Sequence, residues 1–313
     1  MPLLTLFTAP KPMTTPLIAT IQRNAFASWK ALGDKVSVAL IGSEDGLGEA
    51  AKEYGFTYLP QVARNHLGTP LISSIFYLGR SVNQSPYLTY VNADIILYPD
   101  FVEHIQRVGQ ELEKFLIVGQ RYDMDITETI RYDEGWEINL RERMLKEGKL
   151  HTRSGSDYFV YPRTCFDQIP EFTVGRAGWD NWMIYRARKM KWPVVDGSPQ
   201  IEIIHQNHDY SHLPGGQPHY KLPETGENIR LAGGRRVLFL LDDATHILEQ
   251  NKIKPFPKSL MKLYREFVNR PLLKWRSYAL TQFLFALTRP KQASRERKND
   301  RIMAANMRKS RQG

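Results

Sequence analysis

The chain has 313 residues, of which 42% are hydrophobic and 24% are charged, proportions that exclude extensive disorder, a collagen-like chain and a small disulfide scaffold. Its single cysteine, Cys165, allows no disulfide within the chain and favours a reducing compartment. The net charge of +10 is uneven, because residues 254–313 carry 16 Lys and Arg against 3 Asp and Glu, whereas residues 1–253 carry 27 against 30.

Apolar runs alternate with helical patterns in the first half of the chain. No basic segment precedes the first run, which therefore predicts a strand and not a signal peptide. Strands are predicted at 3–8, 36–41, 56–62, 87–97 and 115–119, and helices at 16–29 (with Thr15 as N-cap), 46–54, 70–82 and 101–112. This alternation indicates an α/β fold with a mainly parallel sheet flanked by helices. Ligands of such sheets bind at the carboxyl ends of the strands.

The second half is less regular. Its patterns predict helices at 134–147 and 179–190, and strands at 157–162, 193–195 and 201–205. The predicted organisation is a body of residues 1–253, a helical extension at 254–288 and a basic, disordered tail at 289–313.

The extension is predicted to be amphipathic. Leu260, Tyr264, Phe267 and Val268 fall at helical spacing, and Lys258, Lys262 and Arg265 fall on another face. Pro271 is expected to interrupt this helix, and 272–287 is expected to form a second, apolar one. No apolar run reaches the about 18 residues that a transmembrane helix needs.

The residues Asn92-Ala93-Asp94 introduce polar side chains into the strongest predicted strand. An acid at the carboxyl end of a strand is placed to hold a divalent cation, because hard cations prefer carboxylate oxygen. A cation held there would neutralise a diphosphate. The same residues are also typical of a turn cap, so both interpretations stay open.

Four of the eight histidines lie between positions 205 and 219, where the strand 201–205 enters a loop. The spacing of His205, His208 and His212 lacks a cysteine partner and does not match a tetrahedral zinc site. One histidine that completes an oxygen-rich manganese or magnesium site fits better. Histidines that only hydrogen-bond within a structured loop are the alternative.

Asp180 lies between Trp179 and Trp182 near a predicted helix start. Tryptophan rings can stack on sugars, and a carboxylate beside them can accept a proton from a hydroxyl. An N-cap beside core tryptophans is the alternative. Two blander segments are 154–158, which includes Asp157, and 65–71, which includes Thr69; they offer polar groups to an acceptor and to a phosphate, respectively, or form an ordinary turn and cap.

The order of these segments resembles the GT-A class of nucleotide-sugar glycosyltransferases, and more narrowly a bacterial glycosyltransferase-like group. The matching residues lie in Leu6–Pro12, Tyr90–Ile96, Gly155–Phe159, Gly178–Trp182 and His205–His208. The resemblance implies a Rossmann-like fold with a donor half at about 1–125 and an acceptor half at about 126–253. It also implies transfer of a sugar from a nucleoside-diphosphate sugar to a hydroxyl acceptor.

The resemblance assigns expected roles to individual residues. The class uses an Asp-x-Asp motif for metal and diphosphate; here Asn92 takes the first position, Asp94 inherits the metal role, and His205 or His208 completes the shell around Mn²⁺ or Mg²⁺. Asp180 matches the base of inverting members. The remaining candidates are Thr8, Ala9, Thr69, Asn92 and Asp94 for the donor and Asp157, Trp179 and Trp182 for the acceptor.

Other functions remain open. Asn92 in place of an acid favours, as the main alternative, a catalytically inactive protein that binds a sugar or nucleotide. The loop after the first strand, Thr8–Pro12, argues against a nucleotidyltransferase, which would need a Gly-rich, Arg-containing loop, and a phosphohydrolase would need a second carboxylate cluster.

The basic appendage has no nucleic-acid motif, so nucleic acid is not an expected partner. It fits an anionic membrane surface into which Trp275, Phe283 and Phe285 insert, or it packs on the body. The sequence therefore predicts a cytoplasmic protein, peripheral on the inner membrane face. The acceptor stays open between a glycan, a lipid-linked sugar and a small metabolite, of which the first two are the expected partners.

Overall fold

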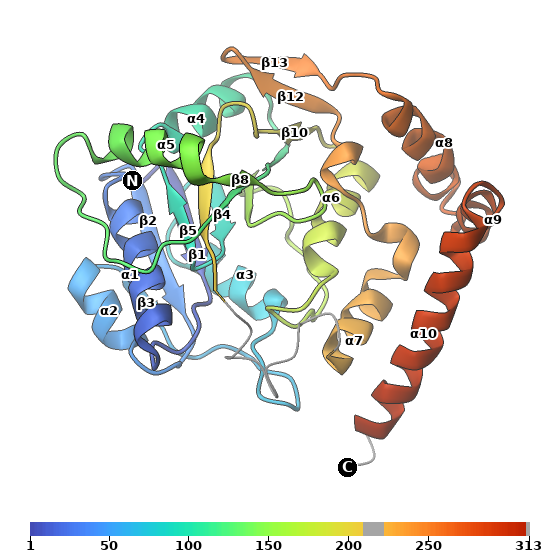
Figure 1. Cartoon of the computed structure of the whole chain (residues 1–313), viewed down its shortest axis with the longest axis horizontal. Helices are drawn as coiled ribbons and strands as arrows, with labels where there is room; N and C mark the ends of the chain where they lie inside the picture. The colour runs from blue at the N-terminus through green and yellow to red at the C-terminus, as the bar shows by residue number, and fades with distance from the viewer. Residues whose placement is uncertain (209–221, 311–313) are drawn as a thin grey trace.

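The computed structural model describes residues 1–208 and 222–310, and a nine-stranded sheet forms its centre (Figure 1). Neighbouring strands are parallel except for β9 against β4 and β6, and β13 against β12. In spatial order the strands are β13 (Lys252–Pro255), β12 (His246–Glu249), β10 (Val194–Asp196), β6 (Leu116–Val118), β9 (Tyr158–Pro162), β4 (Tyr87–Val91), β1 (Leu4–Thr8), β2 (Val36–Ile41) and β3 (Thr57–Leu59). The predicted fold class, an α/β fold with a mainly parallel sheet flanked by helices, is confirmed.

The N-terminal half follows the predicted alternation. Its helices are α1 (Pro16–Lys30), α2 (Leu47–Tyr54), α3 (Ile72–Ser81) and α4 (Phe101–Glu111). Thr15 caps α1 as predicted, since its side chain accepts a hydrogen bond from the Ile18 N–H at 3.4 Å. Helix α3 packs closely on β1, where a Cβ atom at Gly79 would lie 2.4 Å from the ring of Phe7.

The run predicted as one strand at 87–97 is two strands in two sheets. Strand β4 ends at Val91, the Asn92 N–H donates to the carbonyl of Asp157 at 2.9 Å, and the chain then enters β5. The second sheet has the order β5 (Ile95–Leu97), β11 (Ile203–Gln206), β7 (Tyr122–Met124) and β8 (Lys149–Leu150). Asp94 therefore lies where the chain passes from one sheet to the other.

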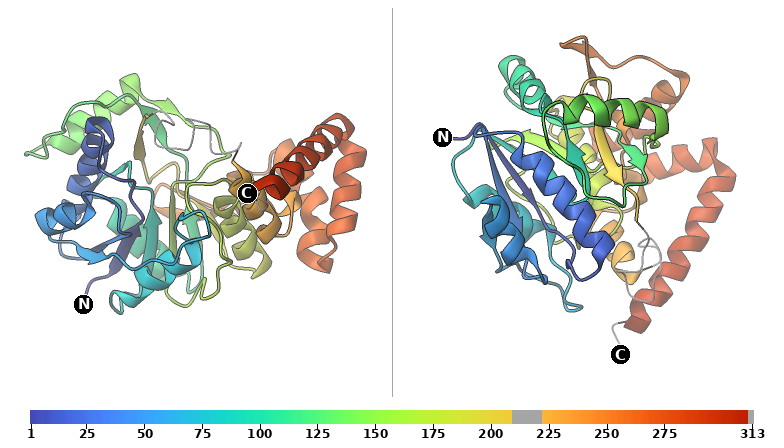
Figure 2. Two further views of the ribbon diagram at one scale, coloured as in Figure 1. Left: turned by 90° about the horizontal axis from the view of Figure 1, so that it is seen from below. Right: turned by 60° about the vertical axis from the view of Figure 1, so that its left-hand side comes forward.

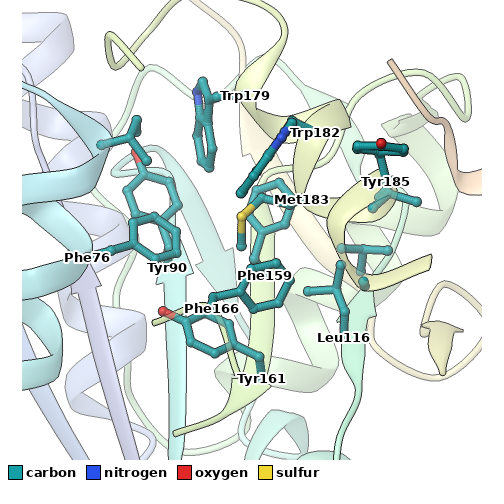
Figure 3. Close-up of a cluster of buried hydrophobic side chains, with 14 of the residues drawn as sticks. Phe76, Tyr90, Leu116, Phe159, Tyr161, Phe166, Trp179, Trp182, Met183 and Tyr185 are labelled. Atoms are coloured by element: carbon teal, nitrogen blue, oxygen red, sulfur yellow. The ribbon is translucent and has the colours of Figure 1, made fainter. Parts of the chain in front are cut away.

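Aromatic side chains fill the core beneath helix α6 (Trp179–Lys189), as Figure 3 shows. The ring of Phe76 stacks on Tyr90 and on Tyr161, with ring centroids 5.7 Å and 5.9 Å away. Trp179 meets Tyr90 edge-on at 5.1 Å. The first turn of α6 is thereby fixed over β4. The other helices of this half are α5 (Trp136–Glu147) and α7 (Pro223–Ala232).

Three helices form an outer layer along one side of the molecule (Figures 1 and 2): α8 (Leu260–Trp275), α9 (Tyr278–Thr288) and α10 (Pro290–Ser310). The predicted interruption at Pro271 is wrong, because α8 continues to Trp275 and the chain turns at Arg276, whose φ is 54°. A proline removes only one backbone hydrogen bond, and burial of Val268 and Leu272 around it holds the helix together.

The prediction of a disordered tail at 289–313 is also corrected, since residues 290–310 form α10. Two ion pairs fasten α10 to the short 3-10 helix Arg235–Val237: Arg235 with Asp300 and Arg236 with Glu296. Ala293 on the same helix is fully buried. In the described part of the chain, no helix has both the length and the apolar character needed to cross a bilayer.

Candidate active site

Asp94 carries a buried carboxylate at the junction of the two sheets. Lys11, from the loop after β1, places Nζ 2.9 Å from Asp94 Oδ2. His208, which follows β11, places Nε2 3.2 Å from the same oxygen and 2.7 Å from Lys11 Nζ. Burial opposes ionisation of Asp94, but the Lys11 charge and the bond to His208 outweigh it and hold its pKa well below the usual range. Asp94 is therefore an ionised carboxylate with an ammonium group against it.

The surroundings of Asp94 also form a set of three possible metal ligands. Asp94, His205 and His208 each offer one ligand atom, and these three atoms all lie within 4.8 Å of one another. The second carboxylate oxygen, Oδ1, is buried and accepts no hydrogen bond from the described residues. One carboxylate with two imidazoles suits manganese and other first-row divalent ions. The donor set fits such an ion, on the condition that Lys11 leaves Oδ2. His212, the further histidine of this prediction, lies outside the described part of the chain.

A second network of charges joins His205 to Asp157. His205 Nδ1 lies 3.1 Å from Asp123 Oδ1, and Arg121 bonds both Asp123, at 2.8 Å, and Asp157, at 2.6 Å. The amide of Asn92 donates to the other oxygen of Asp157 at 2.7 Å. Burial opposes ionisation of Asp123, but hydrogen bonds from His205 and Arg121 lower its pKa. Asn92 thus positions the Asp157 carboxylate beside the Asp94 site.

Asp180 lies in the first turn of α6, where the Gly178 N–H donates to its Oδ1 at 3.1 Å. Burial raises the pKa of Asp180 to about 6; backbone hydrogen bonds oppose this rise, and the negative charge of Asp157 adds to it. Burial, together with the charges of Asp94 and Asp157, also raises the pKa of Tyr90. A shared pocket for Asp180 and Asp94 stays a prediction.

The two predicted sugar-stacking residues belong to the core. Trp179 is 6% exposed and packs on Tyr90 and Phe159, while Trp182 is 7% exposed and packs on Phe172. Figure 3 shows both rings at the α6 side of the aromatic cluster. Their placement fixes the helix that carries Asp180, and their contact with an acceptor stays a prediction.

The predicted donor residues occupy different surroundings. Thr8 ends β1 and is fully buried, and its hydroxyl has no hydrogen-bond partner in residues 1–208 and 222–310. Ala9 is half-buried against the core. The Thr69 N–H donates to the Asn65 side chain at 2.9 Å, so this amide is already engaged. Thr8 and Ala9 lie in the segment that leads to Lys11; a donor role for Thr69 stays a prediction.

Sequence reasoning missed Lys11, Asp123 and Arg121. Lys11 stands inside the matched segment after the first strand, and the general rule that ligands bind at strand ends was the signal that marked it. Asp123 lies in the three-residue strand β7, which is too short to show a period.

Comparisons with known proteins give matches among solved structures only. No protein-family model matches the chain, and no curated protein matches it. A mannosyltransferase from Pyrobaculum calidifontis in complex with GDP-Man and Mn²⁺ is 8% identical, with a TM-score of 0.46 over 74% of this chain and 63% of that one. Glucosyl-3-phosphoglycerate synthase from Mycobacterium tuberculosis is 14% identical, with a TM-score of 0.46 over 83% and 88%.

A third match is TarS from S. aureus in complex with UDP-GlcNAc, which is 10% identical, with a TM-score of 0.45 over 87% of this chain and 73% of that one. All three TM-scores lie below 0.5, and the ligands belong to those proteins. The chain itself has an α/β fold with a mainly parallel sheet.

Proposed function

We propose that the protein transfers a sugar from a nucleoside-diphosphate sugar to a hydroxyl acceptor. The observation that carries the proposal is the cluster of Asp94, His205 and His208, whose ligand atoms lie within 4.8 Å of one another. Asp180, a carboxylate of raised pKa at the start of α6, is the proposed base. The arrangement provides positive charge for a leaving diphosphate and a base for an attacking hydroxyl.

On this proposal Asp94, His205 and His208 would hold Mn²⁺ or Mg²⁺. A bound ion would supply Lewis-acid stabilisation of the charge that develops on the diphosphate. The chain itself contributes Lys11, which would leave Asp94 Oδ2 to a bound ion, and His205, whose Nδ1 lies 3.1 Å from Asp123 Oδ1. Asn92 holds Asp157, and Thr8 and Ala9 lead into the Lys11 segment.

Asp180 acts as the base in this mechanism. Its carboxylate takes the proton of the acceptor hydroxyl while that oxygen attacks the anomeric carbon, and the bond from that carbon to the diphosphate oxygen breaks with its electron pair. A base is most effective when its pKa lies near the working pH, and a pKa of about 6 leaves Asp180 ionised at neutrality. Asp157, Trp179 and Trp182 are the proposed acceptor side, and the acceptor is a glycan or a lipid-linked sugar.

A protein that binds a sugar nucleotide without turnover is the second candidate, favoured by Asn92, which stands where the class has an acid and whose amide nitrogen donates to Asp157. A cytoplasmic protein acting at the inner membrane face would meet a lipid-linked acceptor directly.

The test is an assay of transfer and of slow hydrolysis with a panel of UDP- and GDP-sugars in the presence of Mn²⁺ or Mg²⁺. Asp180→Asn is expected to bind the nucleoside diphosphate normally but to lose about 10²- to 10⁴-fold in turnover. Asp94→Asn is expected to lose both binding and turnover. Glu103→Gln, an exposed acid on α4, is the matched control and should change neither. Absence of turnover in the wild type, together with nucleotide binding that survives Asp94→Asn, would reject the enzyme in favour of a different role.

A further inference from the structure

Helix α8 is packed with its polar side inward. Lys262 is 4% exposed and bonds the carbonyl of Ala244, and Arg265 donates from Nε to Asp243 at 2.9 Å. Asn269 donates to the same carboxylate at 3.2 Å. Because these polar residues hold α8 to the body, its opposite face turns to the surface. Of the predicted basic face, Lys262 and Arg265 thus point toward the body, whereas Lys258, which precedes the helix, is exposed.

The outward face of α8 is apolar. Leu260, Leu263 and Phe267 are spaced by three and four residues and are 88%, 48% and 56% exposed. Residues at this spacing share one side of a helix. Isolated exposed apolar residues are common, but a stripe of them on a helix whose polar face is buried marks a contact surface.

Helix α9 repeats the arrangement. It contains no charged residue, and Leu280, Phe283 and Leu287 are 38%, 61% and 68% exposed at the same spacing. Phe285 does not belong to this surface, contrary to the prediction, because it is 7% exposed and lies under the Arg236 guanidinium. Helices α8 and α9 pack against each other as a hairpin (Figure 1). We call the two stripes of three residues the α8–α9 apolar surface.

The same two helices and their ends also carry exposed positive charge. Exposed basic residues lie along α8 and at the ends of both helices: Lys258, Arg270, Lys274, Arg276, Arg289 and Lys291. The acidic residues of the described part of the C-terminal segment are engaged, Glu266 with Lys262, Glu296 with Arg236, and Asp300 with Arg235. The hairpin therefore carries exposed apolar and exposed basic side chains together, and we call the six basic residues the basic rim.

We propose that the α8–α9 hairpin docks on an anionic lipid bilayer, with the α8–α9 apolar surface inserted among the acyl chains and the basic rim against the headgroups. Apolar residues with flanking Lys and Arg are what an interfacial helix requires, because insertion and headgroup attraction act together. Trp275, 63% exposed at the end of α8, lies where a ring would meet the headgroup boundary. This docking is independent of the proposed sugar transfer.

The test is co-sedimentation of the full chain with vesicles of phosphatidylcholine, with and without phosphatidylglycerol. The wild type is expected to bind the anionic vesicles, to bind the neutral ones weakly, and to lose affinity as salt increases. Phe267→Ser with Phe283→Ser is expected to lose about tenfold or more in partitioning for each ring removed. The control is Ile138→Ser with Leu145→Ser on α5, which are 61% and 64% exposed and should leave binding unchanged. Circular dichroism of each variant checks that it is folded.

The proposal is overturned if the folded wild type does not sediment with anionic vesicles, or if the two double variants bind alike. A concentration-dependent dimer that Phe267→Ser with Phe283→Ser dissociates would instead assign the surface to a second copy of the chain. Loss of sugar transfer with vesicle binding intact would count against the proposed function alone.

Discussion

Replacing Lys11 by Met is expected to tighten binding of Mn²⁺ to the Asp94 site. Lys11 Nζ lies 2.9 Å from Asp94 Oδ2 and 2.7 Å from His208 Nε2, so the ammonium group contacts two of the three candidate ligands. The side chains are 26% exposed for Lys11 and 8% for Asp94, so solvent screens the pair only in part. A metal ion and Lys11 cannot both occupy this position.

The size of the effect follows from the contact that the ion must break. A hydrogen bond to a charged group is worth about 1.5–3 kcal/mol, which corresponds to about ten- to a hundredfold in apparent affinity. Methionine keeps the length of the chain, carries no charge and is a poor ligand for manganese. Lys11→Met should therefore bind Mn²⁺ about ten- to a hundredfold more tightly than the wild type.

Titration of Mn²⁺ followed by its electron paramagnetic resonance signal measures this directly, without any substrate. The variant should be less stable without metal, because Asp94 loses its partner, and Mn²⁺ should raise its melting temperature more than that of the wild type. Lys52→Met, an exposed lysine on α2, is the control. Equal Mn²⁺ affinities for Lys11→Met and the wild type would refute the reasoning.

Three further outcomes are expected. Burial raises the pKa of Asp180 from 3.8 to about 6, so the folded protein loses stability as the pH rises through this window. In urea unfolding, Asp180→Asn should raise the free energy of unfolding by up to about 3 kcal/mol at pH 8 and by about nothing below pH 4. Sugar transfer by the wild type should rise with pH through about 6. Equal stability of the two proteins at both pH values would contradict the raised pKa. Asp243→Ala should lower the free energy of unfolding by about 3 kcal/mol or more, because it leaves Arg265 without its carboxylate. Hydrogen exchange should then show that α8 opens first. Unchanged protection of the α8 amides would argue against a polar attachment of this helix. Gly79→Ala should lower the free energy of unfolding by about 1–3 kcal/mol, since the new Cβ meets the buried Phe7 ring. A melting temperature at or above that of the wild type would show that α3 can move away from the ring.

The sequence was sufficient for the parallel half of the fold because that half obeys local rules. Val36–Ile41 is a β-branched run bounded by turns, and the helix after Thr15 carries its own cap. The run at 87–97 was not resolved into two strands, since residues on both sides of Asn92 are equally apolar and buried. Periodicity cannot show a change of sheet; only the pairing of β5 with β11, far along the chain, defines it.

The residues of the candidate site, too, were predicted from the sequence only in part. Asp94 and His208 were predicted because their residue types stand out at strand ends, and the structure brings them to 3.2 Å. Lys11 was missed because the strand-end rule marked its loop but not its partner, Asp94, which lies 83 positions away in the sequence. Lys262 and Arg265 point toward the body because their partners lie outside the segment: the Ala244 carbonyl accepts from Lys262, and Asp243 accepts from Arg265.

The Lys11 ammonium on Asp94 also links the two sheets. Lys11 belongs to the loop after β1 of the large sheet, and His208 follows β11 of the small one, so their shared contact with Asp94 fastens the two sheets at one point. The contact of Lys11 with Asp94 and the packing of the two sheets are linked reciprocally. If a diphosphate binds the Lys11 ammonium, as the proposed function implies, the small sheet is held less firmly. Conversely, when the small sheet is held in place, Asp94 binds Lys11 more tightly. The amides of β7 and β11 are thus expected to report on the occupancy of the site through their rates of hydrogen exchange.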